Sequence, residues 1–160
     1  MNRSEHYHVA IVVPDLMAGR AHYADLLGLA WGPVMEFDGD FIDGAGNERV
    51  LHLKACYSSV APYLELIEEM RGTEWECNEY SNIHHIGFWS DDVEADSARW
   101  STAGCPLALG SRESGVMQMA YHRDPFGVRL EIVHEAQREM IEQIMCAPAT
   151  DTSPMPMEFG

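Results

Sequence analysis

The chain has 160 residues, of which 46% are hydrophobic and 22% charged, as expected for one globular domain or two closely packed half-domains. Its formal net charge of −16 argues against nucleic acid or an anionic membrane surface as a partner, because both would repel the chain. A small-molecule substrate stays compatible even if it is anionic, since a bound cation can reverse the sign of the potential inside a pocket.

The first part of the chain predicts a strand, a helix and three further strands. The first strand begins at His8 and ends before Asp15, which is placed to cap the N-terminus of a helix over 17–27. Gly28 follows that helix, as glycines commonly do at a helix C-terminus. The three further strands are expected over 30–37, 49–57 and 63–68.

The second part repeats this order. His85 opens an apolar strand, and Asp92 follows it after the same interval that separates the first histidine from its aspartate. A helix is expected over 94–103, with Gly104 after it. The remaining strands are expected over 106–110, 116–123 and 129–134, with a turn at 124–127 joining the last two.

Repetition of one pattern within a chain predicts a duplicated fold of the α+β class with two tandem βαβββ modules. The expected boundaries are 1–70 for the first module, 71–82 for a linker, 83–135 for the second module, 136–146 for a C-terminal helix and 147–160 for a flexible tail.

Sequence features also bear on the compartment. The polar N-terminus does not have the pattern of a signal peptide, and no apolar stretch approaches the roughly 20 residues of a membrane span. The cysteines lack paired CxxC spacing, which favours reduced thiols; they are Cys56, Cys77, Cys105 and Cys146. We therefore expect a cytoplasmic protein.

Strand alternation gathers two histidines and two glutamates on corresponding faces. Side chains at alternate positions of a strand share a face, and the aliphatic face must pack on the helices. His8 and Glu65 in the first half, and His85 and Glu131 in the second, lie opposite the aliphatic positions of their strands. Each half therefore contributes one imidazole and one carboxylate.

These four side chains suit a divalent metal ion. A lone strand histidine or glutamate is more often a core or solvent-facing residue than a ligand. Two buried carboxylates would, however, cost several kcal/mol each without a cation, on the order given for buried ions. Two nitrogens and two oxygens suit Zn²⁺, Co²⁺, Ni²⁺, Mn²⁺ or Fe²⁺, and we expect one such ion.

The residues around these positions resemble the vicinal oxygen chelate superfamily, the glyoxalase, bleomycin resistance and extradiol dioxygenase fold. The resemblance covers about 6–135, and its first motif is closest to the methylmalonyl-CoA epimerase and glyoxalase-like branch. It implies an open eight-stranded barrel-like cup around a metal site, whose ligands would be His8, Glu65, His85 and Glu131. The motifs that carry it are HVAIVVPDL, YLELIE, IHHIGFWSDDV and DPFGVRLEIV.

The chain also departs from that branch. The Asp- and Gly-rich segment 36–47 does not match the part of the epimerase that carries a second catalytic glutamate. Glyoxalase I holds glutathione with basic residues, and the one candidate counterpart in this chain is Arg123. Tyr121, His122 and Trp89 are further candidates for substrate contact, although packing in the core or at the rim explains them equally well.

The resemblance implies a metal-dependent isomerase, epimerase or lyase that chelates vicinal oxygens of a small carbonyl or thioester substrate and stabilises an enolate. Glu131 or Glu65 would move the proton as a catalytic base. The family also predicts a homodimer.

Two alternatives remain at this point. His8, His85 and Glu131 could form the iron triad of a non-haem extradiol-type dioxygenase, with Glu65 set aside. The second alternative is a non-catalytic protein that binds a small molecule such as a drug, which would not need four ligands of this type.

Overall fold

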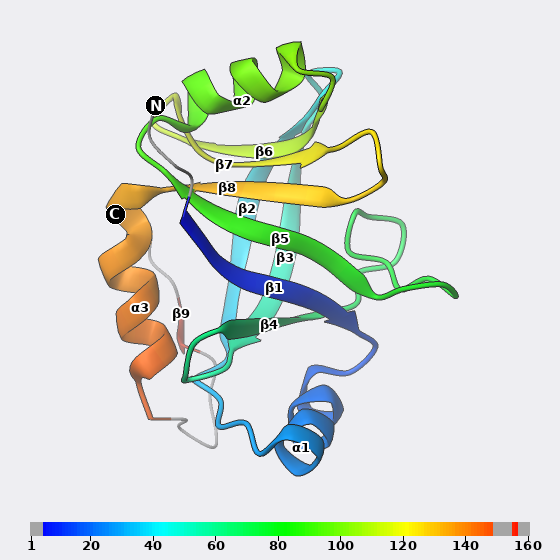
Figure 1. Ribbon diagram of the computed structural model, residues 1–160, viewed down its shortest axis with the longest axis vertical. Helices are drawn as coiled ribbons and strands as arrows, with labels where there is room; N and C mark the ends of the chain where they lie inside the picture. The colour runs from blue at the N-terminus through cyan, green and yellow to red at the C-terminus, as the bar shows by residue number, and fades with distance from the viewer. Residues whose placement is uncertain (1–4, 149–154, 157–160) are drawn as a thin grey trace. The chain divides into compact units, whose positions relative to one another are not determined.

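The computed structural model describes residues 5–148 and 155–156. Its element order, shown in Figure 1, is strand, helix and three strands, followed by the same series again. The elements are β1 (Glu5–Val13), α1 (Leu16–Leu27), β2 (Met35–Asp43), β3 (Glu48–Tyr57), β4 (Tyr63–Glu68), β5 (Ile83–Ser90), α2 (Val93–Thr102), β6 (Leu107–Glu113), β7 (Val116–Arg123), β8 (Arg129–His134), a 3-10 helix (Glu135–Gln137), α3 (Arg138–Cys146) and β9 (Met155–Pro156).

The chain folds into two compact units that do not coincide with its sequence halves. Unit 1 combines 85–139 with the start of β1 and with 39–51, which hold the end of β2 and the start of β3. Unit 2 combines 8–38 and 52–84 with the C-terminal segment from 140 onward. The end of the hairpin formed by β2 and β3 thus belongs to unit 1, although the sequence places it in the first predicted module. The module boundaries stay a prediction.

In unit 2, β4 lies between two neighbours. It pairs in parallel with β1, where Ala10 is the partner of Glu65, and antiparallel with β3, where Tyr57 is the partner of the same glutamate. The core beneath α1 is built on Leu16 and Leu66, both fully buried. Because Leu66 packs on the helix side, the neighbouring Glu65 points to the other face.

Unit 1 repeats this pattern. Strand β8 pairs in parallel with β5, where Gly87 is the partner of Glu131, and antiparallel with β7, where Tyr121 is its partner. Ile132 packs with Phe88 in the core beneath α2, which Figure 1 shows running alongside β6 and β7. Glu131 therefore points away from the helix, as its counterpart in unit 2 does.

Both helices begin at the predicted aspartates. The carboxylate of Asp15 accepts the N–H of Ala18 at 2.8 Å, and that of Asp92 accepts the N–H of Ala95 at 3.0 Å. Gly28 ends α1 with φ of 69°, a conformation that favours glycine. The α+β class with two βαβββ series is confirmed.

The second strand is displaced from its predicted place. We expected a strand over 30–37, whereas β2 is Met35–Asp43. Pro33 lacks a backbone donor, and Trp31 makes only an isolated bridge to Ser58. The polar end of β2 becomes a strand because its residues 41–43 pair with β6 and Phe41 is buried there. Similarly, β6 continues to Glu113 rather than stopping at 110.

The C-terminal helix is present, preceded by the short 3-10 turn. The predicted flexible tail lies mostly outside the described residues; within it, Met155 pairs in parallel with Met35 of β2. Among the described residues, no helix has the length and apolar character needed to cross a membrane. All four cysteines are free.

Candidate metal centre

The first predicted pair lies in unit 2. His8 Nε2 is 3.2 Å from Glu65 Oε2, and the two side chains are 0% and 9% exposed. The edge of the Tyr57 ring meets the His8 ring, with centroids 5.4 Å apart and planes at 90°. An imidazole nitrogen and a carboxylate oxygen therefore face each other in a buried setting.

The second pair, in unit 1, has the same construction. His85 Nε2 is 3.4 Å from Glu131 Oε2, and the side chains are 0% and 7% exposed. The ring of Tyr121 lies 5.0 Å from that of His85. Each glutamate thus has a small residue on its parallel neighbour and a tyrosine on its antiparallel neighbour.

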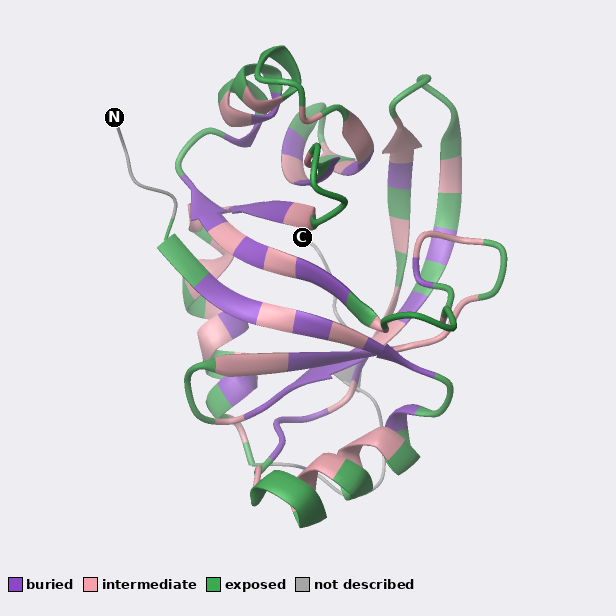
Figure 2. Ribbon diagram, turned by 45° about the vertical axis from the view of Figure 1, so that its right-hand side comes forward, coloured by how far each residue is buried: buried purple, intermediate pink, exposed green. Residues whose placement is uncertain are grey.

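Corresponding strands of the two repeats also have the same pattern of buried residues. Strands β4 and β8 have the same order of intermediate and buried positions, with the glutamate at the first of three buried residues. Strands β1 and β5 both alternate after their histidine, which the bands of buried and intermediate colour in Figure 2 make visible. The duplication therefore extends from sequence to packing.

The donor set fits a divalent cation. Within the described part of the chain, His8 and Glu65 of unit 2 and His85 of unit 1 are buried side chains of metal-ligating type, each able to offer one ligand atom. Both histidines present Nε2 toward a carboxylate, the arrangement of nitrogen and oxygen donors that Zn²⁺ and its neighbours in the periodic table accept. Glu131 adds a carboxylate of the same kind in unit 1.

The surroundings of the second pair include Tyr7, which sequence reasoning missed. Its phenol O–H donates to Glu131 Oε2 at 3.4 Å. Its ring is stacked on the predicted substrate residue Trp89, with centroids 3.9 Å apart and planes at 14°. Arg138 lies over the same indole, 5.8 Å from the ring centre. Trp89 is 2% exposed, and its Nε1 has no hydrogen-bond partner among the residues that the structure describes.

Of the candidates on β7, Tyr121 lies on the face of the histidine–glutamate pair, with its ring beside that of His85. His122 is fully buried on the other face, beneath α2. Its Nδ1 lies 2.8 Å from the carbonyl oxygen of Cys105, and its Nε2 lies 2.9 Å from the hydroxyl of Ser97. His122 thus has structural contacts beneath α2, because strand alternation directs it toward the helix, and its contact with substrate stays a prediction. Arg123 is exposed at the end of the strand.

His84, which precedes the predicted ligand in β5, is buried and has a local structural role. Its Nε2 lies 2.7 Å from the carbonyl oxygen of Glu74, and its ring is stacked on Trp75. It fixes the segment between β4 and β5 rather than facing solvent.

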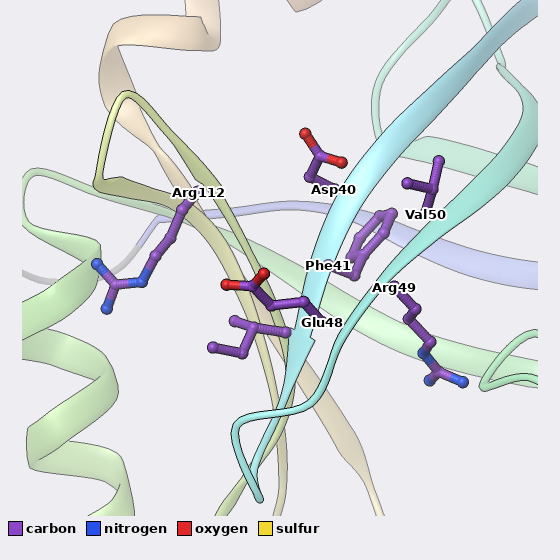
Figure 3. Close-up of a pocket in the computed structure, with 7 residues that line it drawn as sticks. Asp40, Phe41, Glu48, Arg49, Val50 and Arg112 are labelled. Atoms are coloured by element: carbon purple, nitrogen blue, oxygen red, sulfur yellow. The ribbon is translucent and has the colours of Figure 1, made fainter.

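A surface pocket of about 570 Å³ lies elsewhere in unit 1, where β2 and β3 meet β6. Figure 3 shows the guanidinium groups of Arg49 and Arg112 pointing in opposite directions around it. Arg112 binds Glu94 at 2.8 Å, outside the pocket lining. The two guanidinium groups therefore do not converge on this pocket.

Tyr57 was absent from the prediction, whereas its counterpart Tyr121 was a predicted candidate for substrate contact. Tyr57 and Tyr121 occupy corresponding positions on β3 and β7, each paired with a glutamate. A search for repeated tyrosines among the strand residues could have found Tyr57 as the counterpart of Tyr121. No repeat marks Tyr7, since its counterpart before the second histidine is His84.

Comparison with known proteins confirms the family resemblance of the sequence. A family model described as the glyoxalase/bleomycin resistance protein/dioxygenase superfamily matches residues 7–122. No curated protein matches the chain.

Solved structures resemble the chain in fold. A variant of methylmalonyl-CoA epimerase from Streptomyces coelicolor, in complex with 2-nitronate-propionyl-CoA, has 19% identity and a TM-score of 0.60, covering 84% of this chain and 99% of that one. The epimerase from Mycobacterium tuberculosis has 18% identity and a TM-score of 0.56, covering 88% and 96%. A variant of 4-hydroxymandelate synthase from Streptomyces coelicolor has 12% identity and a TM-score of 0.50, covering 82% and 49%.

Proposed function

Because the chain belongs to the glyoxalase/bleomycin resistance protein/dioxygenase superfamily, we propose that it is a metal-dependent isomerase, epimerase or lyase. Its substrate would be a small carbonyl compound or thioester with two vicinal oxygens. One observation carries the proposal: each unit holds a buried histidine facing a buried glutamate, at corresponding strand positions.

The four side chains that would hold one divalent ion are His8, Glu65, His85 and Glu131. Two imidazoles and two carboxylates would leave a divalent ion nearly neutral, which removes much of the cost of burying the glutamates. When bound, the ion supplies Lewis acidity for the two vicinal oxygens of the substrate.

Glu131 is the proposed base. A carboxylate within reach of a carbon next to a carbonyl group can take its proton and return it to either face or to a neighbouring atom. Glu131 is 7% exposed and lies beside Tyr121 and Tyr7, so this proton transfer would take place largely out of contact with water. Glu65 in the matching position of unit 2 is the second candidate.

The experiment measures both the metal content of the protein and proton transfer to and from the substrate. Elemental analysis of the purified protein would identify the ion, and a screen of α-hydroxy ketones and acyl-CoA thioesters in deuterated water would detect exchange at carbon. We expect Glu131→Gln to retain metal and lose exchange by at least about 100-fold, within the usual range for a catalytic base. Asp25→Ala, an exposed change on α1, is the control. Undiminished exchange in Glu131→Gln would remove Glu131 from the role of base.

A dioxygenase would behave differently. The triad His8, His85 and Glu131 would leave Glu65 without a function, yet Glu65 is 9% exposed and faces His8. This burial favours four donors over three. Bound iron together with oxygen consumption on catechols would reverse that preference.

A homodimer, which the family predicts, is tested by sedimentation of the same preparation.

A further inference from the structure

We infer that Tyr7 is a positioning residue for Glu131, an inference that rests on the proposed function. Its phenol O–H donates to Glu131 Oε2 at 3.4 Å, and His85 Nε2 lies 3.4 Å from the same oxygen. The contact is longer than most O–H···O hydrogen bonds, so the phenol holds this oxygen by a weak bond. By holding one carboxylate oxygen, the phenol limits rotation of the carboxylate and determines which lone pairs remain for a cation or a substrate proton.

Tyr7 is held firmly enough to act in this way. Tyr7 is 8% exposed, and its ring is stacked on Trp89 with the ring centroids 3.9 Å apart. Such stacking restricts the movement of the side chain. Trp89 is covered in turn by Arg138, which binds Glu5 through two nitrogens at 2.9 and 3.1 Å. Because Glu5 is two residues before Tyr7 on β1, this ion pair also anchors the strand that carries the phenol.

The two modules use the position before the histidine for different purposes. In β5 that position is His84, which binds the Glu74 carbonyl and supports the segment before the strand. In β1 it is Tyr7, which crosses to β8 and contacts a predicted metal ligand. The ring of Tyr7 alone provides the stacking on Trp89, so the hydroxyl is not required for this packing. Its contact with Glu131 is a separate interaction.

Removing the hydroxyl while keeping the ring separates these roles. Tyr7→Phe preserves the stacked ring and deletes the donor. Groups that orient a metal ligand are worth about 10–100-fold in metal affinity or activity. We therefore expect Tyr7→Phe to weaken Co²⁺ binding by about 10-fold or more and to lower kcat with KM changed less. The melting temperature of the metal-free protein should stay close to that of the wild type.

The experiment titrates metal-free wild-type, Tyr7→Phe and Tyr80→Phe proteins with Co²⁺ by calorimetry and records the visible spectrum of each complex. Tyr80→Phe is the matched control, because the Tyr80 side chain is 90% exposed. A third comparison places Tyr7→Phe in a Glu131→Ala background, where the hydroxyl has lost its acceptor. Weaker binding and an altered spectrum only in the presence of Glu131 support the inference.

Three outcomes would overturn it. Equal affinity and spectrum in Tyr7→Phe and Tyr80→Phe would show that the hydroxyl does not orient the ligand. A loss of the same size in the Glu131→Ala background would show that Tyr7 acts through another group. If the wild-type chain binds no Co²⁺, the proposed function fails together with this inference, whereas the first two outcomes leave that function intact.

Discussion

Strand histidines of this chain differ in function according to the face on which they lie. His8 and His85 face carboxylates, whereas His84 and His122 bind backbone carbonyl oxygens. His52, at 58% side-chain exposure, bridges two acidic groups of β2. The identity of a residue is therefore a poor guide to its role until the face and the neighbouring strand are known.

His122 predicts a loss of stability in mild acid. Burial lowers the pKa of His122, and its bond to the Cys105 carbonyl opposes this only in part. Because the folded pKa lies below the unfolded value of about 6.5, the unfolded chain gains the proton first. The contribution of His122 to stability is thus complete above that pH and is lost as the pH falls toward the folded pKa.

We expect His122→Gln to lower the free energy of unfolding at pH 7.5 by about 1–3 kcal/mol, the cost of leaving buried partners unsatisfied. The difference from the wild type should shrink at pH 5.5. Urea unfolding at both values measures it. A difference that is unchanged or larger at pH 5.5 would contradict the assignment of a neutral, buried imidazole.

His52 predicts the opposite dependence. Hydrogen bonds to Glu36 and to Asp38 raise the pKa of His52, with nitrogen–oxygen distances of 2.9 and 2.7 Å. Its contribution is complete below the unfolded value of about 6.5 and is lost as the pH rises through the folded one. His52→Gln should therefore destabilise more at pH 5.5 than at pH 8.5. Because the pair is exposed, the effect should stay below about 1 kcal/mol, and a larger loss at pH 8.5 would exclude this explanation.

At the scale of elements, helix starts and hairpin turns follow local chemistry. Asp15 and Asp92 cap their helices, and Asp124 accepts the N–H groups of Phe126 and Val128 in the turn between β7 and β8. These contacts involve residues close in sequence, so their pattern could be read directly. The place of β2 could not, because it depends on pairing with β6, where Phe41 meets Ser111 from a distant part of the chain.

The caps give a prediction for α1. Asp15→Ala removes the acceptor for Ala18 N–H and should lower the free energy of unfolding by about 1 kcal/mol, as is typical for an N-cap. Asp25→Ala, near the other end of the same helix, removes a negative charge from the C-terminal side and should be neutral or slightly stabilising. Thermal unfolding of both variants checks this. Equal losses would indicate a general effect of charge rather than a cap.

For the molecule as a whole, the proposed metal ion should stabilise the folded chain. A ligand that binds only the folded state stabilises it by mass action, by about 2.7 kcal/mol at a concentration of 100 times Kd. Metal removal should thus lower the melting temperature. His8→Ala in unit 2 and His85→Ala in unit 1 should each abolish this response, with His22→Ala, an exposed change on α1, as the control.

Metal stoichiometry separates one shared ion from two independent ones. One ion per chain in the wild type, with none in either variant, agrees with the proposal. If each variant keeps a bound ion and half of the thermal response, the two histidine–glutamate pairs act separately and a single centre is excluded.

Much of the fold and of the site could be predicted because the information is periodic and local. Alternation along a strand placed His8, Glu65, His85 and Glu131 opposite the aliphatic side chains, and the aspartates marked both helix starts. Such patterns depend on backbone geometry that each segment carries with it. The repeated order of elements then followed from the repeated sequence.

Only the tertiary structure decided which long-range partners these segments meet. It extended β2 over polar residues, turned His122 under α2 and brought the Tyr7 hydroxyl from β1 to Glu131 on β8. Each outcome depends on residues far apart in the chain, whose pairing is set by packing and strand register rather than by local preference. The sequence by itself determined the four candidate ligands, and the tertiary structure decided what surrounds them.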